Sequence, residues 1–270
     1  MLALLLEVAS TPTPGNVDRH HDHDDLRFEH FLAGAVGALD GLAMAARPEG
    51  GLGRAFERAV AGMARQRGGN TQFGALLVVV PLVRAHARGE LTRDGAAAVA
   101  GRTTVADAIA FYEAFDHVDV AVADPPAGIA DCDVRRGSDA VPAVREREID
   151  LKGVLAAGAD HDAVAREWTT RFERTFAVAE RLRAIDGPVL DRAATVWLEQ
   201  LAAHPDSLIS IQHDRETAEW ATERARAVRN GDSDIATLAR TFQNRSINPG
   251  ATADIVAAGL FVALQRGLVV

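Results

Sequence analysis

Apolar residues recur at helical spacing through most of this chain, and this periodicity limits its fold more than any other feature. The clearest run starts near Leu26 and has the members Phe28, Phe31, Leu32, Val36, Leu39 and Leu42. Side chains at this spacing share one face of a helix, so we expect a core helix here. The same pattern predicts helices at about residues 2–9, 54–66, 71–87, 104–115, 161–185, 188–203 and 214–229.

The sequence therefore predicts an all-α protein. A chain of 270 residues with 48% hydrophobic residues can bury a sizeable core. The stretch from Asp124 to Pro142 lacks periodicity and is rich in turn residues, so we expect an irregular excursion there. Because the helices on either side have the same composition, nothing indicates a second fold, and we expect a single compact multi-helix domain over residues 1–270.

The segment from Thr11 to Asp22 presents polar side chains on a stiff backbone. Two prolines and a glycine come directly before Asn16, Asp18 and Arg19. Such a loop holds hydrogen-bonding and charged groups in restricted positions, which is typical of a binding or catalytic site. The same residue types are also common in a capped loop between two helices. The residues alone leave both interpretations open.

Two further helix starts are marked by glycine and proline. Gly69 precedes Asn70 and Thr71, either of which can cap the next helix, and the unpaired backbone N–H groups of that first turn favour a phosphate. Near the other end, Asn248 suits the cap and Pro249 the first position of the last helix. Asp254 then falls in its first turn or two, where the helix dipole favours a carboxylate for stability alone. A glycine-rich helix cap without a ligand explains the sequence from Gly69 to Thr71 equally well.

Charge and motif content exclude several functional classes. The chain carries 38 acidic and 29 basic residues, and its net charge of −9 repels nucleic acid and anionic lipid, so we expect neither as a partner. Lys152, the only lysine, is followed by Gly153 and Val154, which excludes a P-loop. The single cysteine cannot form an internal disulfide. The apolar start is ended by Glu7, too early for a signal peptide or membrane span, so we expect a cytoplasmic protein.

Three segments in this order resemble the signature of the triphosphoribosyl-dephospho-CoA synthase family, which builds the prosthetic-group precursor of citrate and malonate decarboxylating systems. Glu7 to Arg19 matches a pattern of Glu, small residues, Pro-x-Pro-Gly and x-Val-Asp-Arg. Gly68 to Thr71, with Gly74, matches the second segment, and Ser246 to Leu260 is similar to Ser-Pro-Gly-Gly-Ser-Ala-Asp-Leu. The resemblance implies an all-helical transferase that moves a 5-triphosphoribosyl group from ATP to the 2′-hydroxyl of 3′-dephospho-CoA and releases adenine.

The resemblance also implies roles for residues of these segments. The reaction passes through a ribosyl centre with oxocarbenium character, which a carboxylate stabilises, and the triphosphate requires cations, including Mg²⁺. Asp18 and Asp254 are then the catalytic and metal-binding carboxylates, and Glu7 is a weaker candidate. The substrate- and phosphate-binding residues are Asn16, Arg19, Gly69, Asn70, Thr71, Asn248 and Gly250. We expect the three segments to meet around one pocket.

Departures from the family pattern indicate a divergent branch of the kind found in archaea. Many members read Asn-Thr-His-Lys-Gly where this chain has Gln72 and Phe73 before Gly74, a loss of two cationic or titratable groups. The family's Arg-Gly-Glu stretch has no clear counterpart in residues 124–150. A related donor or acceptor, and a homo-oligomer, are compatible with the sequence.

Two other functional classes stay open. Imidazole and carboxylate clusters bind divalent metals, so a metal-dependent phosphohydrolase is one alternative; its residues would be His20, His21, Asp22, His23, Asp24, His161 and Asp162. A non-catalytic nucleotide- or CoA-binding protein of the same fold is the other, because Gln72 and Phe73 replace the family's His-Lys pair.

Overall fold

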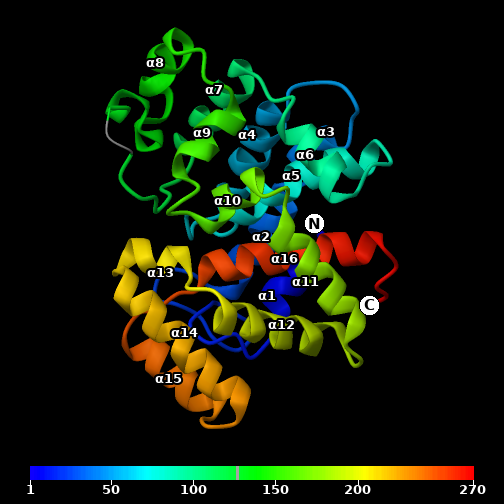
Figure 1. Cartoon of the computed structure of the whole chain (residues 1–270), viewed down its shortest axis with the longest axis vertical. Coiled ribbons are helices and arrows are strands. Elements are labelled where there is room, and N and C mark those ends of the chain that lie inside the picture. The colour runs from blue at the N-terminus through cyan, green and yellow to red at the C-terminus, as the bar shows by residue number, and fades with distance from the viewer. Residues whose placement is uncertain (126–127) are drawn as a thin grey trace. The chain divides into compact units, whose positions relative to one another are not determined.

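The computed structural model describes residues 1–125 and 128–270, and every regular element within these ranges is helical (Figure 1). This confirms the predicted all-α class. Backbone contacts divide the chain into two compact units. The first unit comprises Met1 and Glu29–Arg174, and the second comprises Leu2–Phe28 and Thr175–Val270.

The first unit has an aromatic core. Phe73 lies at its centre, with its ring centroid 5.0 Å from that of Phe56 and 4.9 Å from that of Phe115. Burial of such rings supplies much of the apolar area that stabilises a helical unit. Its elements are α2 (Phe28–Gly37), α3 (Leu39–Ala45), α4 (Leu52–Met63), α5 (Phe73–Ala87), α6 (Arg93–Ala100), α7 (Val105–Phe115), η1 (Ala130–Cys132), η2 (Val134–Ala140), α8 (Val141–Glu146), α9 (Leu151–Gly158) and α10 (Ala163–Thr169).

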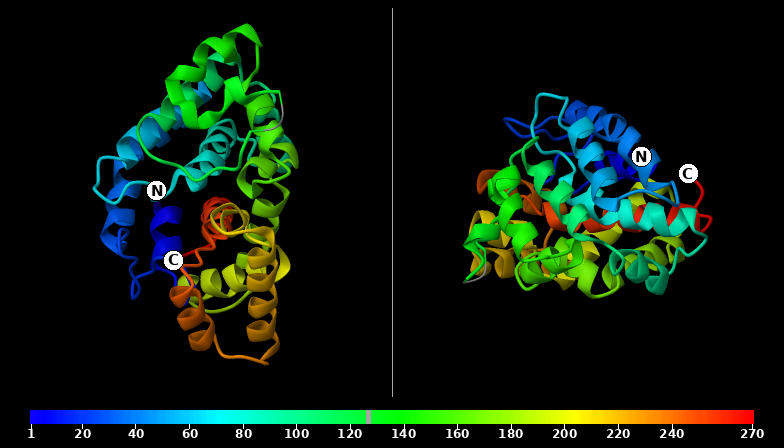
Figure 2. Two further views of the ribbon diagram at one scale, coloured as in Figure 1. Left: turned by 90° about the vertical axis from the view of Figure 1, so that its left-hand side faces the viewer. Right: turned by 90° about the horizontal axis from the view of Figure 1, so that it is seen from above.

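The second unit is built around its last helix, which is buried along almost its whole length and packs against α1, α12 and α13. A helix that is apolar on all sides is stable only inside a core. The pairing of α1 with α16 is visible in both views of Figure 2. The elements are α1 (Leu2–Ala9), α11 (Glu173–Ala184), α12 (Val189–Ala203), α13 (Ser207–Gln212), α14 (Arg215–Asn230), α15 (Ile235–Asn244) and α16 (Gly250–Gln265).

Two sequence predictions about helices are wrong in detail. The helix predicted at 161–185 is interrupted, because Arg171 and Phe172 take positive φ values of 60° and 54° between α10 and α11. The stripe between Phe28 and Leu42 is not a continuous core face, since Val36 and Leu39 are exposed. Small residues of α2 are buried instead.

The excursion predicted between Asp124 and Pro142 is more regular than its composition indicates. It contains the 3-10 helices η1 and η2, and the Asp133 carboxylate accepts a hydrogen bond of 3.0 Å from the backbone N–H of Arg135 at the start of η2. Side-chain caps of this kind stabilise short helices without apolar periodicity. Pro126, which belongs to the predicted excursion, lies outside the described residues.

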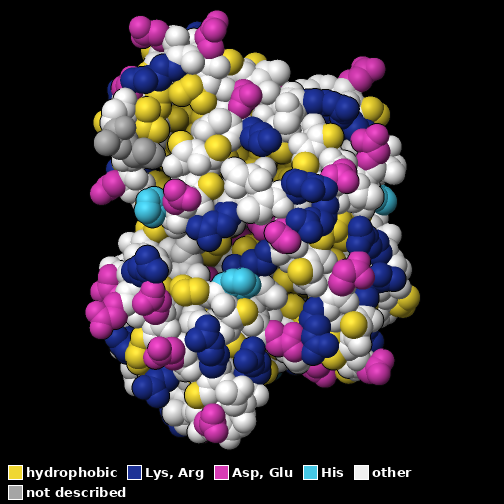
Figure 3. Space-filling model, viewed as in Figure 1, with side chains coloured by type: hydrophobic (Ala, Val, Ile, Leu, Met, Phe, Trp, Pro, Cys, Tyr) yellow, Lys and Arg dark blue, Asp and Glu magenta, His cyan; other side chains and the backbone are white. Residues whose placement is uncertain are grey.

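The surface mixes charges of both signs. On the face shown in Figure 3, acidic and basic side chains are interspersed over the helices. None of the described helices combines the length and the apolar character that a bilayer crossing requires.

Candidate functional site

The loop after α1 folds around the carboxylate of Asp18, which is only 1% exposed. Its Oδ1 accepts a hydrogen bond of 2.8 Å from the backbone N–H of His20 and lies 2.9 Å from Nδ1 of His21. Its Oδ2 accepts from the Thr11 hydroxyl at 2.8 Å and from the Thr13 backbone N–H at 3.4 Å. A carboxylate has about four acceptor positions. Those of Asp18 are therefore occupied by its own loop.

The same loop is in close contact with the segment that leads into α16. Gly15 has a φ of 85°, and a Cβ at this position would overlap the carbonyl oxygen of Ile247 and lie 2.9 Å from Cδ of Pro249. The carbonyl of Gly15 lies 2.8 Å from Nε2 of His23. Only glycine combines this backbone conformation with this close approach. The first and third sequence segments thus meet within the second unit.

The start of α16 differs from the sequence prediction. The helix begins at Gly250, so the prediction of Asn248 as the cap and Pro249 as the first helical residue is wrong by one position. Pro249 has a ψ of 55°, which is not helical, and provides no side-chain cap. The Oδ2 atom of Asp206 instead accepts hydrogen bonds from both the backbone N–H and the hydroxyl of Thr252, each at 2.7 Å. A residue distant in sequence therefore caps this helix.

Asp206 also caps α13, and the sequence prediction did not include it among the site residues. Its Oδ1 accepts from the backbone N–H groups of Leu208 and Ile209 at 2.9 and 3.2 Å, and the side chain is 1% exposed. An aspartate directly before a serine and an apolar run is a normal cap signal, so the α13 cap was detectable. No pattern in the neighbouring sequence indicates the second role of Asp206, as the acceptor of the Thr252 hydrogen bonds.

Three carboxylates of the second unit are coupled. Burial raises the pKa of Glu7 well above its ordinary value of 4.5, and the charges of Asp254 and Asp18 raise it further. Glu7, the weaker candidate of the sequence analysis, is buried, with 8% of its surface exposed. The raised pKa makes Glu7 a neutral proton donor over a pH range in which an ordinary glutamate is ionised.

We expect the substitution Glu7→Gln to stabilise the protein increasingly as the pH rises. Between the unfolded pKa near 4.5 and the raised folded value, the folded state binds more protons than the unfolded state. The free energy of unfolding of the natural protein therefore falls in this window, by up to about 1.4 kcal/mol per pH unit. Glutamine removes that dependence. Thermal melts from pH 4 to 8 measure the stability of Glu7→Gln relative to the natural protein, with Glu223→Gln at an exposed site as control. A stability difference that does not change with pH contradicts the prediction.

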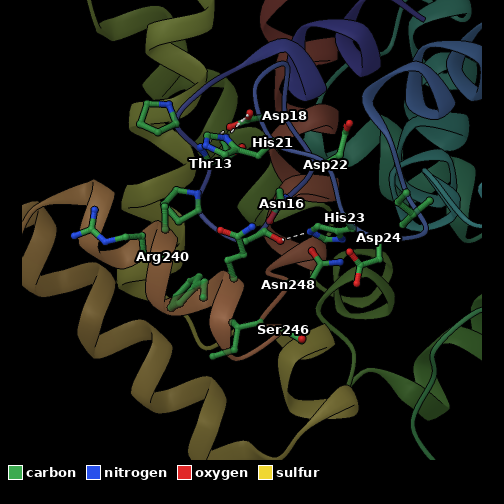
Figure 4. A pocket seen from close by; sticks show the side chains of 18 of the residues that line it. Thr13, Asn16, Asp18, His21, Asp22, His23, Asp24, Arg240, Ser246 and Asn248 are labelled. Atoms are coloured by element: carbon green, nitrogen blue, oxygen red, sulfur yellow. Dashed lines mark hydrogen bonds and ion pairs between the residues drawn. The ribbon is translucent and has the colours of Figure 1, made fainter.

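A cavity of about 660 Å³ opens beside the Asp18 loop, within the second unit (Figure 4). Its walls are the loop between Pro12 and Leu26, α15, Gln212 and residues 246–248. Asn16 and Asn248, which the sequence predicted as binding residues, both line it. Asn16 is 8% exposed, and its Oδ1 has no hydrogen-bond partner within the described part of the chain. An unpaired buried amide oxygen costs about 1–3 kcal/mol, so it requires an explanation.

The remaining predicted residues of the second unit lie outside this cavity wall. Arg19 is exposed at the end of its loop, and Gly250 is the first residue of α16. Asp254 lies one turn further along α16, half-buried. Its charge acts on Glu7, which places it near the carboxylates rather than at the cavity.

The second sequence segment belongs to the first unit. Helix α5 begins at Phe73 with Gln72 at the cap position, so the prediction of Asn70 or Thr71 as the cap is wrong. The Asn70 side chain still accepts a hydrogen bond of 3.0 Å from the backbone N–H of Phe73. Gly69 has a φ of 72° and is exposed. The Thr71 hydroxyl and both polar atoms of the Gln72 amide are buried without a partner among the described residues. Gln72, which stands in the position of the family's His-Lys pair, therefore contributes a buried polar amide to this helix start. That all three segments share one pocket stays a prediction.

The histidine and aspartate residues of the hydrolase alternative have local roles. His21 contacts Asp18, and Asp22 accepts a hydrogen bond of 2.8 Å from the backbone N–H of Phe28. Asp162 caps α10 by accepting from Val164 N–H at 2.8 Å. Across residues 1–125 and 128–270, no group of three or more His, Cys, Asp or Glu side chains is placed to hold a metal ion.

Comparison with known proteins identifies the family. Residues 1–269 match the model of the CitG family, described as ATP:dephospho-CoA triphosphoribosyl transferase. A crystal structure from Archaeoglobus fulgidus, of a protein assigned as a triphosphoribosyl-dephospho-CoA synthase, is 25% identical, with a TM-score of 0.73 over 90% of this chain and 100% of the other. No curated protein matches. The chain therefore belongs to the CitG family and is a triphosphoribosyl transferase that uses ATP and dephospho-CoA.

Proposed function

We propose that the second unit carries the ribosyl-transfer centre, with Asp254, Glu7 and the Asp18 loop as its main parts. The observation that supports this most directly is the coupling of three carboxylates where the first and third family segments meet. In the reaction the bond between C1′ of ATP and N9 of adenine breaks, and its electron pair leaves with adenine. The 2′-hydroxyl oxygen of dephospho-CoA then bonds to C1′, and the proton that it loses balances the proton that the leaving adenine takes up.

Each carboxylate has a different task in this proposal. Asp254 stabilises the positive charge that develops at C1′, since a carboxylate near that carbon lowers the barrier. Burial and the charges of two other acids raise the pKa of Glu7, so in its protonated form it can donate a proton or a hydrogen bond to a group that gains negative charge. The acceptor positions of Asp18 are occupied, so its task is to hold the loop and orient His21.

The residues present do not fit a metal ion that side chains alone would hold. Asp18, the first expected ligand, offers no open acceptor position, and the described residues contain no suitable group of three. Mg²⁺ commonly keeps several waters and binds through substrate phosphates. We propose that any Mg²⁺ arrives with the triphosphate.

Each unit, taken by itself, contains candidate groups for phosphate binding. In the first unit, Gly69, Asn70 and Thr71 precede α5, whose first-turn N–H groups favour an anion. The unpaired polar atoms of Thr71 and Gln72 support a polar ligand there. In the second unit, the exposed Arg19 is free to form a forked contact with phosphate, and Asn248 and Gly250 shape the start of α16.

Two broader expectations belong with this proposal. The family match over residues 1–269 supports one functional domain for the whole chain. We further propose that the enzyme works in the cytoplasm, where the lone buried Cys132 stays reduced, and that a homo-oligomer is compatible with this role.

The decisive experiment is mass spectrometry of mixtures that contain the enzyme, ATP and dephospho-CoA. We expect free adenine and a mass gain on the acceptor equal to one triphosphoribosyl group. Inorganic phosphate without adenine indicates the hydrolase instead. ATP binding without either product indicates the non-catalytic alternative.

We expect Asp254→Asn to lower the rate of adenine release about 100-fold while the KM for ATP changes little, because a charge that acts in the transition state is lost. Steady-state kinetics with adenine detection by chromatography measures this. The exposed Asp232→Asn serves as the matched control. Equal rates for the two variants contradict the role of Asp254.

A further inference from the structure

The cavity beside the Asp18 loop has the size and the lining of a nucleobase site. Its volume of about 660 Å³ lies in the range typical of sites for small ligands. Its walls combine apolar side chains with four carboxamides, those of Asn16, Gln212, Gln243 and Asn248. A carboxamide carries a donor and an acceptor side by side, which matches the edge of a purine.

Asn16 is the most specific of these groups. It is more than nine-tenths buried on the cavity wall, and its Oδ1 has no partner among the described residues. The lone pairs of that oxygen require an N–H donor. Asparagine and glutamine pair in a bidentate way with N6 and N7 of adenine, which offer one donor and one acceptor. Adenine thus supplies the missing partner of Asn16.

Charge argues against a phosphate in this cavity. Its lining includes the acids Asp18, Asp22, Asp24 and Asp25 and only one arginine, Arg240. Figure 4 shows Asp22 and Asp24 on the loop side and Arg240 on α15. A triphosphate would meet a repulsive field here, whereas an uncharged base would not. The charge of the lining therefore favours the base of a nucleotide over its phosphates.

We infer that this cavity binds the adenine of the donor ATP, with the Asn16 carboxamide pairing to the 6-amino edge. The inference rests on the proposed function, because the base that leaves must lie beside the carbon at which the transfer occurs. Asp18 contributes to the cavity wall and its charge reaches Glu7, so the cavity adjoins the three carboxylates. Asn16 is then a base-binding residue and not a phosphate ligand.

Calorimetric titration of free adenine into the full-length protein tests this inference without turnover. Adenine should bind, and hypoxanthine, which lacks the 6-amino group, should bind at least tenfold more weakly. ATP should displace adenine at a concentration at least tenfold lower than dephospho-CoA does. If dephospho-CoA is the better competitor, or hypoxanthine binds as well as adenine, the inference is wrong.

Variants on α15 give a matched comparison. Ala239→Trp fills the cavity from its wall, and Asn244→Trp adds the same side chain at an exposed position of the same helix that does not line the cavity. Ala239→Trp should weaken adenine binding and raise the KM for ATP at least tenfold, and Asn244→Trp should change neither. Asn16→Leu should weaken adenine binding similarly, with a thermal melt to confirm its fold. Equal binding by both tryptophan variants overturns the inference.

The two proposals can fail separately. An enzyme that releases adenine from ATP but does not bind free adenine in this cavity retains the proposed function and loses the inference. A protein that binds adenine here but transfers nothing loses the proposed function and retains the base site.

Discussion

Substitution of Asp18 by asparagine should lower adenine release about 1000-fold and destabilise the fold by about 2–4 kcal/mol. The carboxylate accepts from two backbone N–H groups and the Thr11 hydroxyl and contacts His21. In asparagine an NH₂ group replaces one carboxylate oxygen. This NH₂ donor would face the N–H or O–H donors that now bind Asp18. The loop would lose the hydrogen bonds that hold it around residue 18. His21 would then no longer be oriented, and the wall of the cavity would be disturbed.

Thermal melts and adenine assays on the same sample measure both effects. Asp22→Asn is the control for stability, because Asp22 is exposed and accepts only the backbone N–H of Phe28 among the hydrogen bonds described for it. Its cost should stay below about 1 kcal/mol. A melting temperature of Asp18→Asn equal to that of Asp22→Asn would mean that the loop does not depend on Asp18.

Asp206→Ala should cost about 3 kcal/mol, more than any exposed helix cap of this chain. The substitution leaves the N–H groups of Leu208, Ile209 and Thr252 without their acceptor at a site that is 1% exposed. Since Thr252 lies in the first turn of α16, the position of Asp254 should suffer as well. Activity should therefore fall even below the melting temperature.

The matched control for this prediction is Asp234→Ala. Asp234 caps α15 at an exposed position through Thr237, so its loss should cost about 1 kcal/mol and leave α16 in place. Urea unfolding of the two variants gives the comparison. Equal losses of stability would show that the hydrogen bonds to Thr252 contribute nothing.

The sequence predicted the helical class, because periodicity is a local signal. The family resemblance predicted that three segments meet, and the structure shows the contact between the first and the third. Prediction from sequence failed where a contact across the chain decides the structure. The break at Phe172 depends on a positive φ, which the presence of a phenylalanine does not predict. Asp206 caps a helix 46 residues away. Glu7 lies on α1, which is packed against α12 and α16 from distant parts of the sequence.

The site itself was predictable only in part. The family pattern selected Asn16, Asp18 and Asp254, and the structure places all three in one unit. It did not reveal that the Asp18 oxygens are already occupied or that the Asn16 oxygen is unpaired. Hydrogen-bond saturation is a property of folded coordinates, so no residue pattern reports it.

The second unit is assembled from both ends of the described sequence, with residues 29–174 placed between its two parts. During synthesis α1 emerges before its packing partner α16, which begins at residue 250. During synthesis the contiguous first unit can fold while α1 still exposes its apolar face. The proposed transfer centre can therefore form only after α16 has been synthesised, and we expect a nascent chain stalled before α16 to present α1 to chaperones.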